Sequence, residues 1–547
     1  MASVAQAESS GIPAETAGLQ RGIDWTGAFW IASGVPALVL FSIGTIAASV
    51  GMASWLVWMV SILFGFVQAF SYAEIAGLFP NKSGGASVYG AVAWARYSKL
   101  FAPVSVWCNW LAWSPVLTIG SGLAAGFSLS ILFGPDAAIN TWHLTLLDLS
   151  FLKAGLSLRI NATAIIGAAF LLIAFAIQHR GISSTARTQV VLGVIALLPL
   201  LLIGLVPLIT GDMPRHNLWP IVPLAHDAAG HPVNGHWNAA GISIFLGGLF
   251  VAAWSTYGFE TAVCYTREFR DPSKDTFKAI LYSGLLCIVV FTLVPISFQG
   301  VLGLNGMLSP EIANNMGVAK AMAGMIKVGP VIGPVIGNVI VVMMILALLL
   351  AIIMSMAGSS RTLYQASADG WLPKYLSRVN HAGAPTAAMW TDLGFNLLLL
   401  SMSDYVFVLG VSNVCYILFN FLNLNSAWIH RMDRPGWERP YRAPNVLLGA
   451  GTVLSFVNLA LMGVGADLLG KGTLYTGLVC VALILPVFAW RHYVVDKGHF
   501  PADMVDDLHL RPEPGVATGA GYLPHLTVLA GIAVIAISHW LAVLPPA

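Results

Sequence analysis

Charged residues are scarce in this chain. Asp, Glu, Lys and Arg together make up 9% of its 547 residues, whereas soluble globular proteins hold about 25%. Hydrophobic residues make up 57%. This composition excludes an ordinary soluble protein and is typical of a chain that crosses a membrane several times. The formal net charge of +2 gives no indication of a nucleic-acid partner.

Cysteine is also rare, and no CxxC pair occurs. All five cysteines fall inside apolar segments, which favours small buried hydrophobes over a disulfide or metal framework; they are Cys108, Cys264, Cys287, Cys415 and Cys480. Nothing in the sequence indicates a cofactor. The first twenty residues carry no basic-then-apolar signal peptide, so we expect the first membrane span to direct insertion.

Apolar windows of about 20 residues predict the membrane spans. They predict an all-α polytopic membrane protein with twelve or thirteen spans, of which the last is short. The spans are expected near 27–50, 55–79, 100–133, 160–178, 189–210, 240–262, 280–300, 330–357, 386–402, 404–428, 446–466, 473–490 and 525–544.

Lys and Arg indicate the orientation, because cytoplasmic loops carry an excess of them. Most of these residues fall in the segments that lie inside when the N-terminus is cytoplasmic. The predicted division is therefore a cytoplasmic tail (1–24), a first five-helix repeat (25–210), an extracytoplasmic loop (211–239), a second five-helix repeat (240–428), two further spans (429–490), a cytoplasmic segment (491–524) and a possible thirteenth span (525–547).

Two of the predicted spans are interrupted. In the first, Pro36 cannot donate to the helix and Gly34 loosens it. In the sixth, the run Trp254–Glu260 places a β-branched residue, a glycine and an acid inside an apolar stretch. The two interruptions lie five spans apart, an odd offset that inverts the second copy relative to the first. Interrupted helices at matching positions of inverted repeats indicate a transporter binding site, although ordinary kinks remain the alternative.

Two acids stand most clearly within apolar spans. Glu260 follows the sixth-span interruption directly, and a carboxylate near mid-membrane costs about 2.5–3.5 kcal/mol, so a gating or proton-coupling role is favoured. Glu74 lies near the inner end of the second span, where gating and a structural ion pair are equally supported.

Four stretches resemble the amino acid–polyamine–organocation (APC) superfamily of transporters. They are Ala32–Val35, the acidic helix end and Gly-Gly turn of Tyr72–Trp94, the segment WSTYGFETA with REFRDPSKDTFKAI, and Ser359–Ala388, supported by Arg439–Pro444. The resemblance spans residues 27 to about 490. It implies a LeuT-like fold of two inverted five-helix repeats, with alternating access around a central site.

The resemblance also implies how a substrate binds. In the family, backbone amides of the first-helix element hold a substrate carboxylate, and carbonyls of the unwound sixth helix receive the amino group. Trp254 matches an aromatic residue that stacks on the substrate in one member of the family. The implied substrate-binding residues are Ala32, Ser33, Gly34 and Val35 with Ala253, Trp254, Thr256 and Tyr257.

Other polar and aromatic side chains could line the same pocket. Trp113 belongs to a tryptophan face that suits either lipid or a cation-π wall, and Ser355 could instead bond to its own helix. Ser412 and Tyr416 share one face of the tenth span, which suits a pocket or an interhelical contact. The residues expected to line the pocket are Asn109, Trp113, Ser355, Ser412 and Tyr416.

The chain departs from the family at two places. Ala32 and Pro36 stand where relatives more often have Gly and Phe, which changes the expected pocket shape. The fifth span, Val190–Ile209, contains no ionisable side chain, and Ala196 occupies the position of a lysine found in several proton-coupled relatives. Coupling through that lysine is therefore not expected.

The sequence favours a secondary transporter, not an enzyme, in the cell membrane. Its expected substrate is an amino acid, moved by proton coupling or exchange, and a polyamine or other organic amine is the alternative. A membrane enzyme is disfavoured because no intramembrane His–Asp or His–Glu set is present. A transporter-like sensor stays open, as does the oligomeric state. A fold of two six-helix halves is disfavoured by the five-span offset.

Overall fold

The computed structural model of this chain describes residues 19, 21–133, 137–227, 229–313, 315–326, 333–502, 504 and 519–543. Most of the predicted cytoplasmic tail and much of the segment 491–524 lie outside these residues. Each of the thirteen predicted spans coincides with helix in the described part of the chain. Ten stretches of it are long and apolar enough to cross a membrane.

The first five predicted spans fall on helices of very different regularity. The first is divided into α2 (Trp25–Ala32), η2 (Val35–Leu38) and α3 (Val39–Val50). The second is α4 (Ser54–Gly77), and a short helix, α5 (Ala86–Ala95), follows it. The third is α6 (Phe101–Trp113) continued by α7 (Pro115–Leu132), the fourth is α9 (Ala162–Gln178), and the fifth is α10 (Ile182–Thr210).

The next five spans also begin with a divided helix. The sixth consists of α11 (Ala239–Thr256) and the 3₁₀ segment η5 (Gly258–Glu268). It is followed by α12 (Pro272–Met307), α15 (Gly333–Ala368), α16 (Thr386–Leu400) and α17 (Tyr405–Asp433). The final spans are α18 (Asn445–Gly465), the run of α19 (Thr473–Ala482), α20 (Ile484–Ala489) and η8 (Trp490–Val495), and then α22 (Leu523–Val543).

The stretch Trp25–Gly77 must hold two crossings. Its 53 residues would make a straight helix of about 80 Å, against an apolar core of about 30 Å. Gly51, at φ 72°, ends α3, because this left-handed region is accessible to glycine without a steric penalty. The chain then turns back along α4, which packs against α11 and α12.

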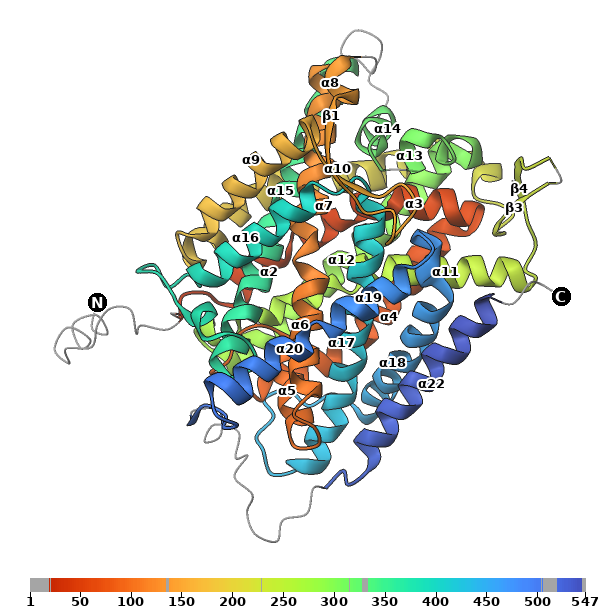
Figure 1. The fold of residues 1–547 in the computed structure, drawn as a ribbon. Coiled ribbons are helices and arrows are strands. Elements are labelled where there is room, and N and C mark those ends of the chain that lie inside the picture. The colour runs from red at the N-terminus through yellow and green to blue at the C-terminus, as the bar shows by residue number, and fades with distance from the viewer. Residues whose placement is uncertain are drawn as a thin grey trace.

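The helices form one bundle, and different short helices and strands lie at its two ends (Figure 1). One end, here called the hairpin end, carries α8 (Ala138–Thr141), the hairpin of β1 (His143–Asp148) and β2 (Ser157–Asn161), and the short helices α13 (Pro310–Ala313) and α14 (Val318–Gly324). The other, the α5 end, carries α5 and η6 (Lys374–Ser377). A second small hairpin joins β3 (Leu224–His226) to β4 (Pro232–Asn234). Neither hairpin was predicted.

Helices from distant parts of the sequence pack together in the middle of the bundle. α15 contacts α7, α10 and η2, while α17 contacts α6 and α18. Both interrupted helices are central: η2 lies against α15, and η5 lies against α12 and α4. The last helix, α22, packs on α18 at the edge and is otherwise exposed. The interruptions are therefore enclosed by other helices, as irregular backbone within a membrane requires.

Candidate functional site

The interruption of the first span lies at Ser33 and Gly34, as predicted. The hydroxyl of Ser33 donates to the carbonyl oxygen of Trp30 at 2.5 Å, so this side chain turns back onto its own helix. A Cβ on Gly34 would lie 2.8 Å from the carbonyl oxygen of Leu350 on α15. Glycine is therefore required for the close approach of the two backbones. The amide of Ala37 closes the first turn of η2 on the carbonyl of Gly34 at 3.2 Å, and Pro36 has no amide, so the amides of Gly34 and Val35 are the ones that this turn does not use.

The interruption of the sixth span begins after Thr256. The amide of Tyr257 still bonds to the carbonyl of Ala253 at 3.1 Å, and the chain then tightens into η5. This 3₁₀ segment is 11 residues long, whereas such segments seldom exceed three or four residues and longer ones often mark a functional hinge.

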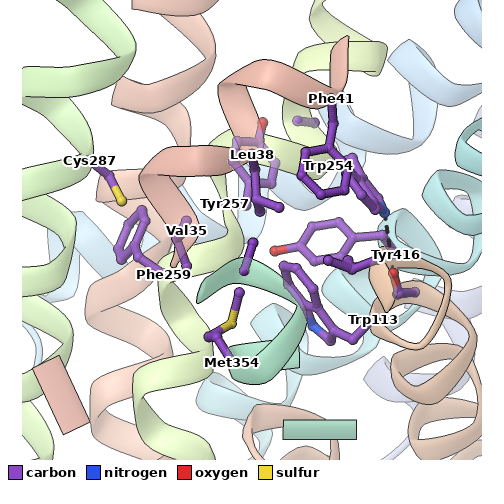
Figure 2. Packing of buried hydrophobic residues seen from close by; sticks show 14 of the residues in the cluster. Val35, Leu38, Phe41, Trp113, Trp254, Tyr257, Phe259, Cys287, Met354 and Tyr416 are labelled. Carbon is purple, nitrogen blue, oxygen red and sulfur yellow. Dashed lines mark hydrogen bonds between the residues drawn. The ribbon is translucent and has the colours of Figure 1, made fainter. Parts of the chain in front are cut away.

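The two interruptions lie side by side (Figure 2). The hydroxyl of Ser255 donates to the carbonyl of Leu38 at 3.2 Å, and it lies 3.3 Å from the hydroxyl of Ser42. A Cβ on Gly258 would lie 3.2 Å from Val35 Cγ1. The structure thus brings together two segments that are more than two hundred residues apart in the sequence.

Five aromatic residues surround this junction and are called the aromatic group below: Phe41, Trp113, Trp254, Tyr257 and Tyr416. The Trp113 and Trp254 rings stack with centroids 6.4 Å apart, and Tyr416 meets Trp113 edge-on at 5.4 Å. Each of the five is at most 2% exposed. Within the described part of the chain the Tyr416 hydroxyl has no hydrogen-bond partner, and it points toward the middle of the group. This group offers flat apolar faces and one unused hydroxyl.

Hydrogen bonds hold the tryptophans in place. Trp254 Nε1 donates to Ser412 Oγ at 2.9 Å and lies 3.2 Å from the carbonyl of Ala112, which also accepts from Ser412 at 2.8 Å. The hydroxyl of Ser355 donates to the carbonyl of Trp113 at 2.6 Å. Ser355 and Ser412 therefore position the aromatic group, and Ser355 bonds to another helix and not to its own.

Glu260 carries the acidic group of this junction. It is 2% exposed, and its Oε1 accepts from Trp113 Nε1 at 3.1 Å. No salt bridge in the described residues includes it. A buried carboxyl without a cationic partner is costly to keep charged, so Glu260 is suited to bind a proton or a cationic group of a ligand.

Thr256 faces away from the aromatic group. Its hydroxyl is 2.7 Å from Ser61 Oγ on α4, and it donates to the carbonyl of Ala252 at 3.0 Å. The carbonyl oxygen of Thr256 lies 3.1 Å from the position of a Cβ on Gly65, also on α4. The family resemblance indicated unwound carbonyls at Ala253, Trp254 and Thr256, but all three residues are still α-helical in α11, and the Ala253 carbonyl accepts from the amide of Tyr257.

Two further predicted residues lie outside this junction. Asn109 Nδ2 donates to the hydroxyl of Thr362 at 2.9 Å, which ties α6 to α15. Glu74 accepts from Arg431 at 2.8 and 2.5 Å and from the amide of Ala443 at 2.8 Å, with Arg439 at 3.3 Å. Glu74 therefore joins α4 to the end of α17 in a structural ion-pair cluster.

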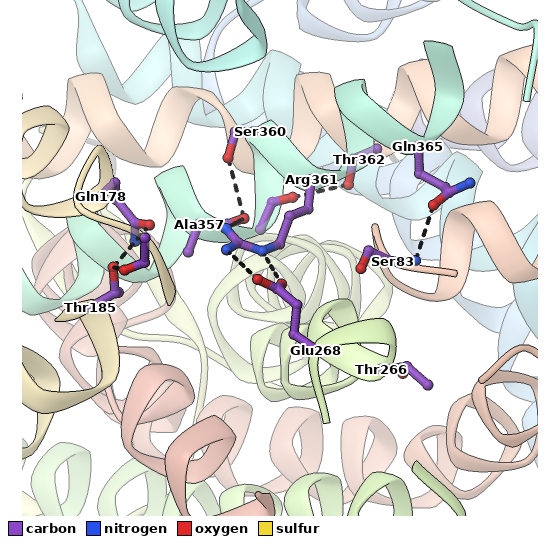
Figure 3. Close-up of polar contacts among 12 residues, drawn as sticks. Ser83, Gln178, Thr185, Thr266, Glu268, Ala357, Ser360, Arg361, Thr362 and Gln365 are labelled. Atoms are coloured by element: carbon purple, nitrogen blue, oxygen red, sulfur yellow. Dashed lines mark hydrogen bonds and ion pairs between the residues drawn. The ribbon is translucent and has the colours of Figure 1, made fainter. Parts of the chain in front are cut away.

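A buried charged network lies between η5 and α15 (Figure 3). Arg361 on α15 holds both carboxylate oxygens of Glu268, at 2.9 Å from Nη2 to Oε1, and each side chain is 1% exposed. Lys82 pairs with Asp369, which also accepts from Gln365 at 2.9 Å. This network links the end of η5 and the segment before α5 to the same helix.

Cavities approach the aromatic group from the hairpin end. A cavity of about 20 Å³ is lined by Phe41, Thr45 and Tyr405. Met316 borders both this cavity and an open hollow of about 460 Å³ whose polar lining includes Arg159, Asn161, Glu311 and Lys320. Met316 is thus the residue that the open hollow shares with the small cavity beside Phe41, and the α5 end has an open hollow of its own, of about 550 Å³, lined by Ser367, Lys374 and Arg491.

Sequence reasoning missed several buried charged residues, among them Asp392, Arg361 and Glu268. Asp392 is fully buried in α16, and its position inside the predicted span 386–402 was the available signal. Arg361 was assigned to a loop because the eighth span was expected to end at residue 357, whereas α15 continues to Ala368. Glu268 lies beyond the predicted sixth span (240–262), whereas η5 keeps it inside the protein.

A multi-pass helical bundle in which two interrupted helices meet at a buried aromatic site has the architecture of a secondary membrane transporter. The comparison with protein families agrees. The chain belongs to the amino acid permease family, whose model matches residues 23–484. This family lies within the APC superfamily and implies the LeuT-like fold, and its members are transporters, not enzymes.

Curated relatives match this chain at low identity, but over most of its length. A polyamine transporter of Oryza sativa subsp. japonica is 23% identical over 473 residues, covering 82% of this chain and 75% of its own. A branched-chain amino acid permease of Bacillus subtilis is 24% identical over 440 residues, covering 77% and 83%. A polyamine transporter of Arabidopsis thaliana is 21% identical over 433 residues, covering 75% and 76%. The relatives thus divide between two substrate classes.

Proposed function

We propose that this protein is a secondary active transporter that carries an amino acid across the cytoplasmic membrane by alternating access. The observation that carries this proposal is the junction of the two interrupted helices, where η2 and η5 meet inside the aromatic group. Residues 25–210 and 240–428 form the two inverted repeats. The N-terminus is cytoplasmic, because the α5 end and the other predicted inner segments carry most of the Lys and Arg residues.

The substrate carboxylate binds at the first interruption. The free amides at the start of η2, around Gly34 and Val35, attract an anion because they point along the positive end of a helical segment. The amino group lies toward the Trp254 carbonyl and Glu260, and the side chain packs against the aromatic group. Ser33 acts through its backbone, since its hydroxyl is bonded to Trp30.

The charge of this junction favours an amino acid over a polyamine. A polyamine brings two or more positive charges, and each would need a buried carboxylate to offset its desolvation. Glu260 is the acid found at the aromatic group, where it bonds to Trp113. Glu268 is already neutralised by Arg361. A zwitterion, in contrast, brings its own carboxylate and requires no additional acid.

The conformation described here is closed to the cytoplasm. The ion pairs of Arg361 with Glu268 and of Lys82 with Asp369 seal the α5 end. The hollow at the hairpin end shares Met316 with the small cavity beside Phe41, whose ring lies 5.7 Å from that of Trp254. Phe41 thus separates the extracytoplasmic hollow from the substrate site, and transport to the inside requires the charged network to open.

Proton coupling through Glu260 is the proposed driving mechanism. A lysine route through the fifth span is absent, because α10 has no ionisable side chain between Val190 and Ile209. Sodium would need several oxygen ligands near the first interruption and α15, but the hydroxyl of Ser355 is committed to the Trp113 carbonyl. Glu260 thus remains as the titratable group in contact with the aromatic group.

Uptake by proteoliposomes tests this function. Purified protein is reconstituted, sodium is replaced by choline, and labelled amino acids are offered with and without an inward proton gradient. We expect uptake without sodium that is faster with the gradient, competed by zwitterionic amino acids and poorly by amines that lack a carboxylate.

Polyamine transport is the second candidate, because two relatives carry that name. Saturable spermidine uptake that amino acids do not inhibit would establish it in place of the first. Tight binding of an amino acid in a thermal-shift assay, without uptake or exchange under any gradient, would instead indicate a sensor.

A further inference from the structure

Asp392 is a buried acid that the proposed function does not use. It lies in α16 and is 0% exposed. No salt bridge among the described residues includes it. A charged residue inside a membrane span is costly, and such residues are usually retained for an ion or proton pathway. The surroundings of Asp392 therefore need an explanation.

Neutral donors from three segments converge on this carboxyl group. Trp110 Nε1 donates to Oδ1 at 2.9 Å, and the hydroxyl of Ser114 donates to the same oxygen. Ser359 Oγ donates to Oδ2 at 2.5 Å. Asn396 Nδ2 lies 3.5 Å from Oδ1 and bonds to Ser114 Oγ at 2.7 Å. Four neutral donors stabilise a carboxylate without a positive charge.

The same cluster also accommodates the protonated acid. Oδ1 must remain an acceptor, because the Trp110 indole can only donate. A proton would therefore reside on Oδ2, facing Ser359, whose hydroxyl can act as donor or acceptor. On protonation, Oδ2–H would donate to Ser359 Oγ, which would turn its own hydrogen to the carbonyl of Met356 at 3.5 Å. The carboxyl group can therefore make its hydrogen bonds in both the ionised and the protonated state without movement of a heavy atom, which suits a proton-binding site.

No charged group on the neighbouring elements that the structure describes balances the negative charge of an ionised Asp392. Helices α7 and α9, which pack on α16, contain no charged side chain. The titratable side chains of α15 and η6 are engaged with other residues: Arg361 with Glu268, Tyr364 with Arg267, Lys374 with Asp496, and Tyr375 with Thr391. The titratable side chain of α6 is the thiol of Cys108, a free buried cysteine. The charge of Asp392 thus depends on whether it holds a proton.

The partners of Asp392 connect it to both parts of the proposed mechanism. Ser114 follows Trp113, which donates to Glu260 at the substrate site. Ser359 is two residues before Arg361, which holds the closed α5 end. We propose that Asp392, with Ser114 and Ser359, forms a second proton-binding site of the transport cycle, distinct from Glu260. This inference rests on the proposed function of a proton-coupled transporter.

Infrared difference spectroscopy of the full-length protein in lipid tests the site without requiring transport. A step from alkaline to acidic pH produces carbonyl-stretch bands from newly protonated carboxyl groups. We expect Asp392→Asn to lose one component that Glu260→Gln retains. We expect Ser359→Ala to shift the frequency of that component, because the bond to Oδ2 is gone. Thr118→Val is the matched control, since Thr118 bonds to Asn396 at 2.8 Å and not to the carboxyl group.

Identical pH-induced spectra in the wild type and Asp392→Asn would overturn the proposal, and so would a band that responds to sodium at constant pH. If Asp392→Asn does not fold, the shift in Ser359→Ala decides alone. In proteoliposomes, the ratio of uptake with and without a proton gradient should fall to unity in Asp392→Asn and stay at the wild-type value in Thr118→Val. Absence of all uptake by the wild type would refute the proposed function, while the spectra would still decide whether Asp392 titrates.

Discussion

Breaking the Arg361–Glu268 pair should open the α5 end of the protein. The substitution Glu268→Gln removes the charge and keeps the size, which leaves Arg361 buried without its partner. Both side chains are 1% exposed and doubly hydrogen-bonded, so loss of one partner costs about 3–5 kcal/mol. If the pair exists only in the closed conformation, its loss destabilises that conformation relative to the open one by the same free energy. This corresponds to an increase of about 100-fold to several thousandfold in its relative population.

Cys264 provides a native reporter for this change. Its sulfur lies 2.6 Å from the position of a Cβ on Gly85 and 3.7 Å from that on Gly358, so it is enclosed beside the network. We expect a thiol reagent to modify Cys264 faster in Glu268→Gln by the factor given above, measured on protein in nanodiscs. The background retains Cys264 alone, with alanine at Cys108, Cys287, Cys415 and Cys480.

A surface ion pair at the opposite end is the control. Lys153 and Asp404 lie 2.5 Å apart but are 24% and 30% exposed, and pairs of this kind contribute about 0–1 kcal/mol. Lys153→Met should therefore leave the modification rate of Cys264 unchanged. Equal rates in Glu268→Gln and the wild type, with folding intact, would show that the pair does not hold the closed conformation.

Three further predictions concern topology, substrate contact and coupling. A cysteine at the exposed position Asn81 should react with an impermeant reagent from the cytoplasmic side and one at His226 from the outside, and reaction of Asn81→Cys from outside would refute the orientation. Trp254→Ala should weaken substrate binding much more than Trp254→Phe, by order 1 kcal/mol; equal affinities in a titration would restrict Trp254 to packing. Glu260→Gln should abolish the effect of a proton gradient while substrate exchange persists, and a gradient effect of wild-type size in this variant would exclude Glu260 from coupling.

The sequence predicted features that depend on local chemistry. Gly34 and Pro36 weaken a helix wherever they occur, so the first interruption could be located before any packing was known. An acid such as Glu260 in an apolar run is equally visible. The structure confirms the helical class and places the first interruption at the expected residues, whereas the sixth-span interruption begins only after Thr256, within the expected run.

The arrangement of side chains around those interruptions depends on packing and could not be predicted. Thr256 and Trp254 are two residues apart, and the rotation of α11 directs one to α4 and the other to the aromatic group. Three of the four donors to Asp392 come from positions 33 to more than 270 residues away, including Ser359 and Ser114. Such a cluster has no local pattern that a single sequence could reveal.

The junction of α6 and α7 connects the two acids mechanically. Three consecutive residues there have different partners: the Ala112 carbonyl accepts from Trp254, the Trp113 indole donates to Glu260, and the Ser114 hydroxyl reaches Asp392. Pro115 follows and lacks the amide that would continue the helix ladder, which allows this point to bend. A movement of α11 or η5 would therefore pull on the same turn that holds Asp392. Because one short backbone segment contacts both carboxyl groups, we expect a change in protonation at either acid to affect the other through this segment.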